Sequence, residues 1–329
     1  MPVKIIAELA QGYEGDPSLA KLLAKAGVVS GADVIKFQCV FADDTAVPSY
    51  HYYDLFKKLE MPFEVWKSVF DIVKEAGKEF YLNIGGQQSL EIAQKLGVDG
   101  VRLHVTNFFN TDLIKAAIKS FPMVYFGVGG ISFNEIQELI NQFNIKPFSN
   151  VSFIYGFQTE PTPIEKNNIL KLKTLMESFP GFNFGFEDHT NGLDKNAQIV
   201  PLLALSIGVH YIEKHLTLDR SLGLEDCISA LTPQEFKNLV NNVRISEKAI
   251  GEGSSELTET EKGYRNKVLK VVVAGKDMPK GQLIEENDLS LKRVENVRDP
   301  SIYRKEDVAG MRLKVNVRTY EQITKEMVL

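Results

Sequence analysis

The stretch VKIIAEL (3–9) followed by PSLAKLLAKAGVVSG (17–31) decides the fold, because the same arrangement recurs along the chain. An apolar run of strand length precedes a segment with helical periodicity, and Pro17 after Asp16 is typical of the first turn of a helix. Seven further apolar runs are each followed by such a segment: DVIKFQC (33–39), EFYLNI (79–84), GVRLHV (100–105), MVYFGVGG (123–130), VSFIYGF (151–157), FNFGFE (182–187) and VHYIEKH (209–215). The expected helices that follow these runs are 62–78, 89–97, 111–121, 132–143, 162–179, 196–208 and 232–251.

These runs are continuously apolar rather than alternating, which indicates strands buried on both faces of a parallel sheet. Eight strand-helix units within residues 1–250 predict an α/β fold, specifically a (β/α)8 TIM barrel. An open, doubly wound sheet is the alternative, but such sheets usually contain fewer units.

The composition changes after residue 250. The stretch GEGSSELTETEKGYRN (251–266) is polar and poor in large hydrophobic residues, which is typical of a linker. Residues 267–329 contain short β-rich runs separated by turn signals, so we expect a small β-rich domain there. Because so short a segment buries little apolar surface alone, we expect it to dock on the barrel or on another subunit.

The overall composition excludes several classes of function. The 329 residues include 38 basic and 43 acidic side chains, a net charge of −5 without an arginine-rich tract. This balance argues against binding to nucleic acid or to an anionic membrane surface. Two cysteines, Cys39 and Cys227, cannot form a disulfide framework, and no apolar run is long enough to span a membrane. We therefore expect a soluble, cytoplasmic protein.

Polar residues stand at the carboxyl ends of the expected strands, where barrel enzymes place their chemistry. Mutual pairing, for example of Glu8 with Lys36, would explain any one of them as a stabilising contact. The whole set instead predicts a ligand-binding site, because buried charges without partners are costly. The set comprises Glu8, Lys36, Gln38, Asn83, His104 to Asn107, Gln158, Glu160, Glu187 to His189 and Glu213 to His215.

Two of these residues suggest a metal. His189 and His215 end the seventh and eighth expected strands, which are neighbours in a barrel, so both imidazoles could reach one divalent ion. Two histidines with water or a carboxylate suit Mn²⁺, Fe²⁺ or Zn²⁺.

Several motifs together resemble the sialic acid (N-acetylneuraminate) synthase family, in which a barrel precedes an antifreeze-like SAF domain. The matching segments are AELAQGYEGD (7–16), GADVIKFQ (31–38), GFQTEPTPIE (156–165), EDHT (187–190), IEKHLTLDR (212–220), LEDCISALTPQEF (224–236) and KGQLIEENDLSLKR (280–293). Members of the family condense phosphoenolpyruvate (PEP) with the open-chain aldehyde of an N-acetylated hexose. The products are a sialic-acid-like 2-keto sugar acid, a nonulosonate, and phosphate.

The resemblance implies roles for individual residues. Glu8, Lys36, His189 and His215 would be catalytic, and the two histidines would bind a divalent metal, expected to be Mn²⁺ with Mg²⁺, Co²⁺, Fe²⁺ or Zn²⁺ as alternatives. The substrates PEP and a sugar would contact Lys36, Gln38, Arg102, Asn107, Gln158 and Asp226. The resemblance also implies a domain-swapped homodimer in which Arg293 of the SAF domain reaches the partner's sugar site.

The chain also departs from the family where the phosphate is bound. Asn83, Val105, Phe126 and Glu187 stand at positions where the family carries hydroxyl-bearing phosphate ligands. Glu187 would repel a phosphate unless a metal or Arg102 neutralises it. Two alternatives to a PEP-dependent synthase therefore remain open. One is a metal-dependent aldolase, lyase or epimerase that acts on a sugar acid without PEP, and the other is a non-catalytic sugar-binding homologue.

Overall fold

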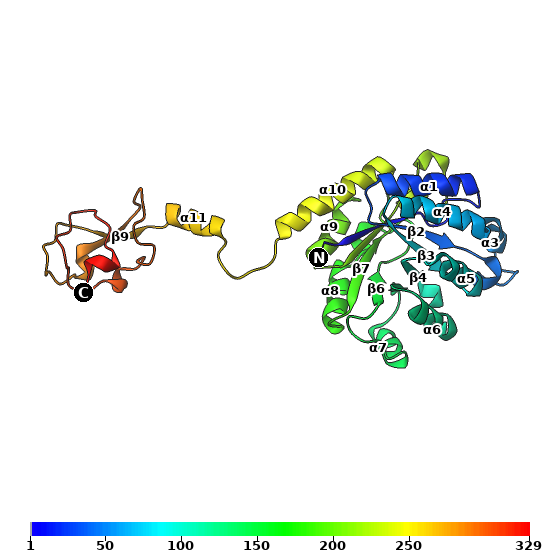
Figure 1. Cartoon of the computed structure of the whole chain (residues 1–329), viewed down its shortest axis with the longest axis horizontal. Coiled ribbons are helices and arrows are strands. Elements are labelled where there is room, and N and C mark those ends of the chain that lie inside the picture. The colour runs from blue at the N-terminus through cyan, green and yellow to red at the C-terminus, as the bar shows by residue number, and fades with distance from the viewer. Residues whose placement is uncertain (1) are drawn as a thin grey trace. The chain divides into compact units, whose positions relative to one another are not determined.

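The computed structural model describes residues 2–329 and divides into two compact units, Met1–Gly251 and Glu252–Leu329 (Figure 1). The first unit is a closed barrel of eight parallel strands, in which each strand pairs with the next and β1 pairs with β8. The strands are β1 (Lys4–Glu8), β2 (Val34–Cys39), β3 (Glu79–Ile84), β4 (Gly100–Leu103), β5 (Val124–Gly127), β6 (Val151–Tyr155), β7 (Asn183–Asp188) and β8 (Tyr211–His215). The predicted barrel is therefore confirmed, and the open-sheet alternative is excluded.

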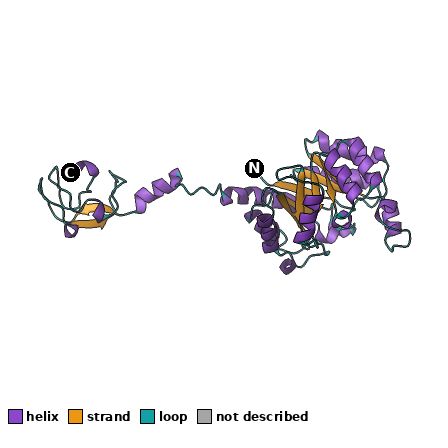
Figure 2. Ribbon diagram, turned by 90° about the horizontal axis from the view of Figure 1, so that it is seen from below, coloured by secondary structure: helices purple, strands orange, loops and turns teal. Residues whose placement is uncertain are grey.

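Helices surround the strands of this unit (Figure 2). They are α1 (Pro17–Val29), α2 (Ala42–Thr45), α3 (Tyr53–Leu59), α4 (Phe63–Glu75), α5 (Gln87–Leu96), α6 (Thr111–Ser120), α7 (Phe133–Gln142), α8 (Ile169–Ser178), α9 (Ile199–Ser206) and α10 (Pro233–Ile250). Several of these helices begin with side-chain caps. Asp16 accepts the Ser18 N–H at 2.7 Å before α1, and Thr232 with Glu235 forms a capping box before α10. The apolar helix faces and the outward-facing strand residues form the main core, which includes Trp66, Phe80 and Phe236.

Two expectations about the helices need correction. The segment 162–179 is not one helix: a 3-10 turn (Ile164–Lys166) is separated from α8 by Asn168, whose φ of +48° interrupts helical geometry. No helix was expected between residues 39 and 62, but this connection after β2 contains the short helices α2 and α3.

The amino-terminal end of the barrel interior is filled by aromatic side chains. Tyr81, Tyr125 and Tyr211, from β3, β5 and β8, form a small cluster of their own, with ring centroids 5.4 and 4.8 Å apart. Glycine on a neighbouring strand makes room for one of these rings, since a Cβ on Gly100 would lie 2.8 Å from the Tyr81 ring. This layer closes the barrel at that end.

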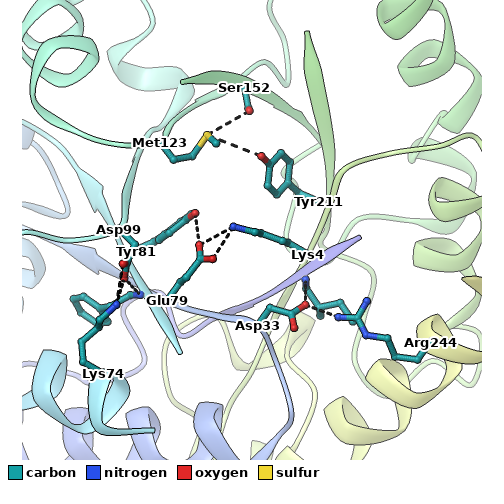
Figure 3. Close-up of polar contacts among 12 residues, drawn as sticks. Lys4, Asp33, Lys74, Glu79, Tyr81, Asp99, Met123, Ser152, Tyr211 and Arg244 are labelled. Atoms are coloured by element: carbon teal, nitrogen blue, oxygen red, sulfur yellow. Dashed lines mark hydrogen bonds and ion pairs between the residues drawn. The ribbon is translucent and has the colours of Figure 1, made fainter. Parts of the chain in front are cut away.

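Polar side chains around this amino-terminal end pair with each other (Figure 3). Lys4 and Tyr81 converge on Glu79 at 2.6 and 2.8 Å. Arg244 of α10 meets Asp33, which also accepts the Ile5 N–H at 2.8 Å. These contacts join the starts of the strands to each other and to α10.

The second unit has its own small core. β9 (Val271–Ala274) and β10 (Leu289–Lys292) form an antiparallel pair, and buried residues such as Ile284, Leu313 and Ile323 pack together around them. The stretch 251–266 is not wholly a linker, because α11 (Glu259–Val268) begins within it. Thr258 and Glu261 form a capping box that starts this helix, a local signal that outweighs the polar composition.

Among the helices of residues 2–329, none combines the length and the apolar character that a membrane crossing would need.

Candidate functional site

Five ionisable side chains meet inside the carboxyl-terminal end of the barrel, which we call the barrel mouth. Lys36 Nζ lies 2.6 Å from a carboxylate oxygen of both Glu8 and Glu213. Arg102 forms an ion pair with Glu187, and its Nη1 is 4.0 Å from Glu213. All five side chains are at most 3% exposed. The mutual pairing weighed for Glu8 and Lys36 is therefore present, within a network that links β1, β2, β4, β7 and β8.

The network contains three carboxyl groups and only two cations. Burial raises the pKa of Glu8 to about 7, although the nearby Lys36 charge opposes the shift. Burial likewise raises the pKa of Glu187 to about 7, against the opposing charge of Arg102. For Glu213 the charges of Lys36 and Arg102 together outweigh burial and hold the pKa below its usual range. Near pH 7 the network is therefore poised to hold or release a proton at Glu8 or Glu187.

His189 and His215 lie together at the ends of β7 and β8, as the sequence predicts. Their Nε2 atoms are 3.1 Å apart, and both side chains are largely buried. Burial lowers the pKa of His189 to about 3 and lowers the pKa of His215 well below its usual range. Both imidazoles are therefore neutral at pH 7, which is the form that binds metals.

The arrangement of the two histidines fits a divalent metal. Imidazole nitrogens bound to one ion at about 2.1 Å lie roughly 3 Å apart when the angle between them is near 90°. His189 Nδ1 is buried and lacks a hydrogen-bond partner within residues 2–329. Over the same residues, no group of three His, Cys, Asp or Glu side chains is arranged to hold a metal. Any ion held by this pair would therefore take its other ligands from water or a substrate.

A pocket of about 240 Å³ opens between β2, β3 and β4 and the helices α2 and α3. In the described chain its lining includes no lysine or arginine. The lining residues are Gln11, Gln38, Cys39, Val40, Asp44, Thr45, Phe56, Asn83, Ile84, Gly85, His104, Thr106 and Asn107. Six of these residues offer amides or hydroxyls that both donate and accept hydrogen bonds, beside the Asp44 carboxylate and an aromatic wall from Phe56. Such a lining suits a neutral, hydroxyl-rich ligand.

His104 links this pocket to the end of β6. Its Nε2 lies 2.6 Å from the Gln158 amide oxygen. Burial, together with the charge of Arg102, lowers the pKa of His104 to about 4, so the ring is neutral and donates to Gln158 from Nε2. On the other side of the pocket, the Gln11 amide donates to Gln38 at 2.9 Å. Gln38 and Asn107 therefore line this pocket, and Gln158 is joined to it through His104.

Asp226 belongs to a second pocket, of about 320 Å³, which Glu160, Gly223 to Glu225, Cys227 and Ile228 also line. Burial first, and then a hydrogen bond with Glu160, raise the pKa of Asp226 to about 8. Asp226 has a φ of +61°, a backbone conformation that aspartate tolerates better than most residues. Arg293 lies in the second unit, where its Nε donates to the Val268 carbonyl at 3.1 Å.

One of the expected departures in the phosphate region was placed wrongly. Phe126 does not face the barrel mouth: its ring packs in the outer core against Phe108 and Phe153. Side chains alternate along a strand, so the inward positions of β5 are Tyr125 and Gly127. Glu187 does face the mouth, and Asn83 lines the first pocket. Val105 begins a 3-10 turn after β4 and packs against the core.

The sequence places Glu213 and Glu160 among the strand-end residues but assigns neither of them an individual role. Glu213 stands two residues before His215 on β8, and alternation along the strand would have assigned both to the inward face. Glu160 was placed at a strand end. Its contact with Asp226 joins two loops that are far apart in the sequence, so no local pattern could have predicted it.

Comparisons with known proteins agree with this architecture. The family model described as "NeuB family" matches residues 23–255, and the SAF domain matches residues 270–329. The chain therefore belongs to the NeuB family and carries a carboxyl-terminal SAF domain. This membership confirms the predicted class, a synthase of the sialic acid synthase type.

Individual relatives span almost the whole chain. The N,N'-diacetyllegionaminic acid synthase of Campylobacter jejuni is 27% identical over 97% of this chain and 97% of its own length. The human N-acetylneuraminate-9-phosphate synthase is 26% identical over 99% of this chain and 93% of its own. A crystal structure of N-acetylneuraminic acid synthetase from Leptospira borgpetersenii, in complex with citrate, superposes with a TM-score of 0.74 at 26% identity. That match covers 82% of this chain and 93% of the other.

Proposed function

We propose that the protein condenses PEP with the open-chain aldehyde of an amino sugar, releasing phosphate and a nonulosonate 2-keto acid. The observation that carries this proposal is the neutral His189–His215 pair beside buried Lys36 and Arg102 at one barrel mouth. The named relatives that make legionaminic and sialic acids support the choice of product class.

In this proposal C3 of PEP forms the new bond to the aldehyde carbon, the aldehyde oxygen takes a proton, and water adds to C2 as phosphate leaves. Lys36 and Arg102 would hold the carboxylate and phosphate of PEP, since both are cations inside the barrel mouth. Glu8 would hold the proton that the aldehyde oxygen takes. Its raised pKa and its tie to the Ala10 N–H, at 2.7 Å, keep a protonatable carboxyl in place.

His189 and His215 would hold a divalent metal, with Mn²⁺ as our first choice. Such an ion supplies Lewis acidity toward a carbonyl oxygen when bound. The neutral state of both imidazoles and their 3.1 Å separation support this assignment.

The sugar would occupy the pocket that Gln38, Asn83, His104 and Asn107 line, because that pocket offers neutral hydrogen-bonding groups and the Phe56 ring. Gln158 would orient His104, while Asp226 would bind a hydroxyl at the far end of the sugar. We further propose a homodimer in which Arg293 of one subunit completes the sugar site of its partner, acting in the cytoplasm where PEP is formed.

One observation favours a second candidate function. The ion pair between Arg102 and Glu187 leaves no unpaired cation among the five buried groups of the mouth. A metal-dependent aldolase, lyase or epimerase that acts on an unphosphorylated sugar acid would need no cation for a phosphate group.

The two candidates differ in the release of inorganic phosphate. We would titrate PEP into the full-length protein by calorimetry, with and without Mn²⁺, and then measure phosphate release with N-acetylated hexosamines as acceptors. Metal-dependent binding that Lys36→Ala weakens, followed by phosphate release, is the expected result. Absence of PEP binding beside an active sialic acid synthase control would contradict the proposal and favour the PEP-independent enzyme.

A further inference from the structure

Arg102, one of the two cations to which the proposed function assigns the anionic groups of PEP, is already paired with Glu187. Arg102 is 3% exposed and Glu187 is 1% exposed, so solvent does not weaken the contact. Arg102 Nη2 donates to Glu187 Oε2, and the other terminal nitrogen faces Glu213 at 4.0 Å. The guanidinium is therefore held by carboxylates of the chain itself.

Two glycines, Gly127 and Gly156, leave the space that the Arg102–Glu187 ion pair occupies. A Cβ on Gly127, at the end of β5, would lie 3.3 Å from Arg102 Nη2. A Cβ on Gly156, just after β6, would lie 2.3 Å from Glu187 Cγ, closer than any real contact. Larger residues at these positions would push the pair apart, so the strands between β4 and β7 are shaped around it.

The pair still has bonding capacity that the chain does not use. Arg102 Nε and Glu187 Oε1 are both buried, and neither has a hydrogen-bond partner in the part of the chain that the structure describes. Unpaired buried polar atoms are costly, which points to a ligand that approaches them. An anion that approaches Arg102 would, however, also approach the carboxyl group of Glu187.

We infer that Glu187 is a specificity-determining residue that competes with phosphate for Arg102. With Glu187 in place, a phosphate must displace the carboxylate from the guanidinium, and the affinity for phosphorylated ligands is low. This inference rests on the proposed function only in placing Arg102 beside the donor. It assigns to one side chain the choice between a phosphorylated and an unphosphorylated ligand.

The test is the binding of inorganic phosphate and of PEP to full-length Glu187→Gln by calorimetry. Glutamine keeps the size of the side chain and removes its charge, so Arg102 becomes available to an anion. A chelator in the buffer prevents binding through a metal at His189 and His215. We expect both ligands to bind about tenfold more tightly or better than to the unchanged protein, because the carboxylate no longer competes for Arg102 or repels the anion.

Two further variants serve as controls. Glu79→Gln removes a carboxylate from the opposite end of the barrel, where it pairs with Lys4, and should leave phosphate affinity unchanged. Adding Arg102→Met to Glu187→Gln should abolish the gain, because the gain depends on the guanidinium. If Glu187→Gln does not fold, Glu187→Ser removes the same charge and leaves more space beside Gly156.

The inference and the proposed function can fail separately. Equal phosphate affinity in Glu187→Gln and the unchanged protein overturns the inference, even if the protein releases phosphate from PEP. Tighter phosphate binding by Glu187→Gln supports the inference, and it does so even when no acceptor yields phosphate release from PEP and the proposed function fails.

Discussion

The two ends of the barrel are built from the same strands but differ in the side chains that fill the interior and in the exposure of their charged groups. At the amino-terminal end, three tyrosines fill the interior, and the charged side chains pair around the rim with 31–41% of their surface exposed. At the carboxyl-terminal mouth, five ionisable side chains fill the interior and are almost wholly buried. Buried charges are costly, so a barrel interior optimised for stability alone would resemble the tyrosine-filled amino-terminal end. We therefore interpret the buried charges of the mouth as serving function.

The largest expected difference between the two ends concerns histidines. His189→Ala or His215→Ala should lower kcat/KM for phosphate release about a thousandfold, because Lewis-acid stabilisation is worth several kcal/mol. His210→Ala is the matched control: His210 precedes β8 at the amino-terminal end, where its Nδ1 accepts the Phe184 N–H at 3.4 Å. Steady-state assays should show its rate within a few-fold of the unchanged protein. Similar losses in all three variants would contradict a metal site confined to the mouth.

Lysines at the two ends should differ in their contribution to stability. Lys36→Met leaves Glu8 and Glu213 buried without their cation, which should lower the free energy of unfolding of the first unit by about 3–5 kcal/mol. Lys4→Met breaks a half-exposed pair with Glu79 and should cost at most about 1 kcal/mol. Urea unfolding of both variants measures the difference. Equal costs would mean that the buried network is no more strongly coupled than a surface pair.

Asp226 should make the stability of the first unit depend on pH. Burial, followed by the hydrogen bond with Glu160, raises its folded-state pKa to about 8, from 3.8 as the ordinary value. The folded state therefore binds the extra proton between these values, and stability falls as the pH rises from about 4 to about 8. Asp226→Asn removes this dependence. Thermal unfolding should show the variant to be the more stable protein at pH 8 and equal to the unchanged protein at pH 4, while its activity decreases.

The smallest expected effect tests whether burial, rather than position at the mouth end, sets the cost of a charge. Glu235 lies in the first turn of α10 at that end, but 35% of its side chain is exposed where it pairs with Arg220 at 2.6 Å. The hydrogen bond with Arg220 is the main cause that lowers the pKa of Glu235 to about 2, although burial opposes it. This stabilisation is complete above the ordinary pKa of 4.5 and is lost as the pH falls toward 2. Glu235→Gln should cost about 0.5–1 kcal/mol at pH 7, after allowance for solvent screening, and almost nothing at pH 2. A cost comparable to that of Lys36→Met in urea unfolding would contradict the role given to burial.

The barrel was predictable from the sequence because each strand-helix unit carries its own periodicity, and several of the helices begin with capping residues. Asp16 before α1 and the Thr232–Glu235 capping box before α10 are local signals that need no tertiary contact. The closeness of His189 and His215 was also predictable, since they end consecutive strands of a closed parallel sheet. The SAF domain followed from turn and motif signals within residues 267–329.

The pairing of the charges at the mouth depends on the three-dimensional fold rather than on local sequence. Lys36 meets Glu213 across 177 positions of sequence, and Arg102 meets Glu187 across 85 positions. The stagger of the strands and the closure of β8 against β1 determine which inward-facing residues come into contact. Neither property can be predicted from a local segment of the sequence. The same cause explains why Phe126 was assigned to the mouth although Gly127 occupies the inward position: one residue of register moves a side chain to the other face. Local periodicity therefore fixes the elements, whereas barrel closure fixes which buried charges meet.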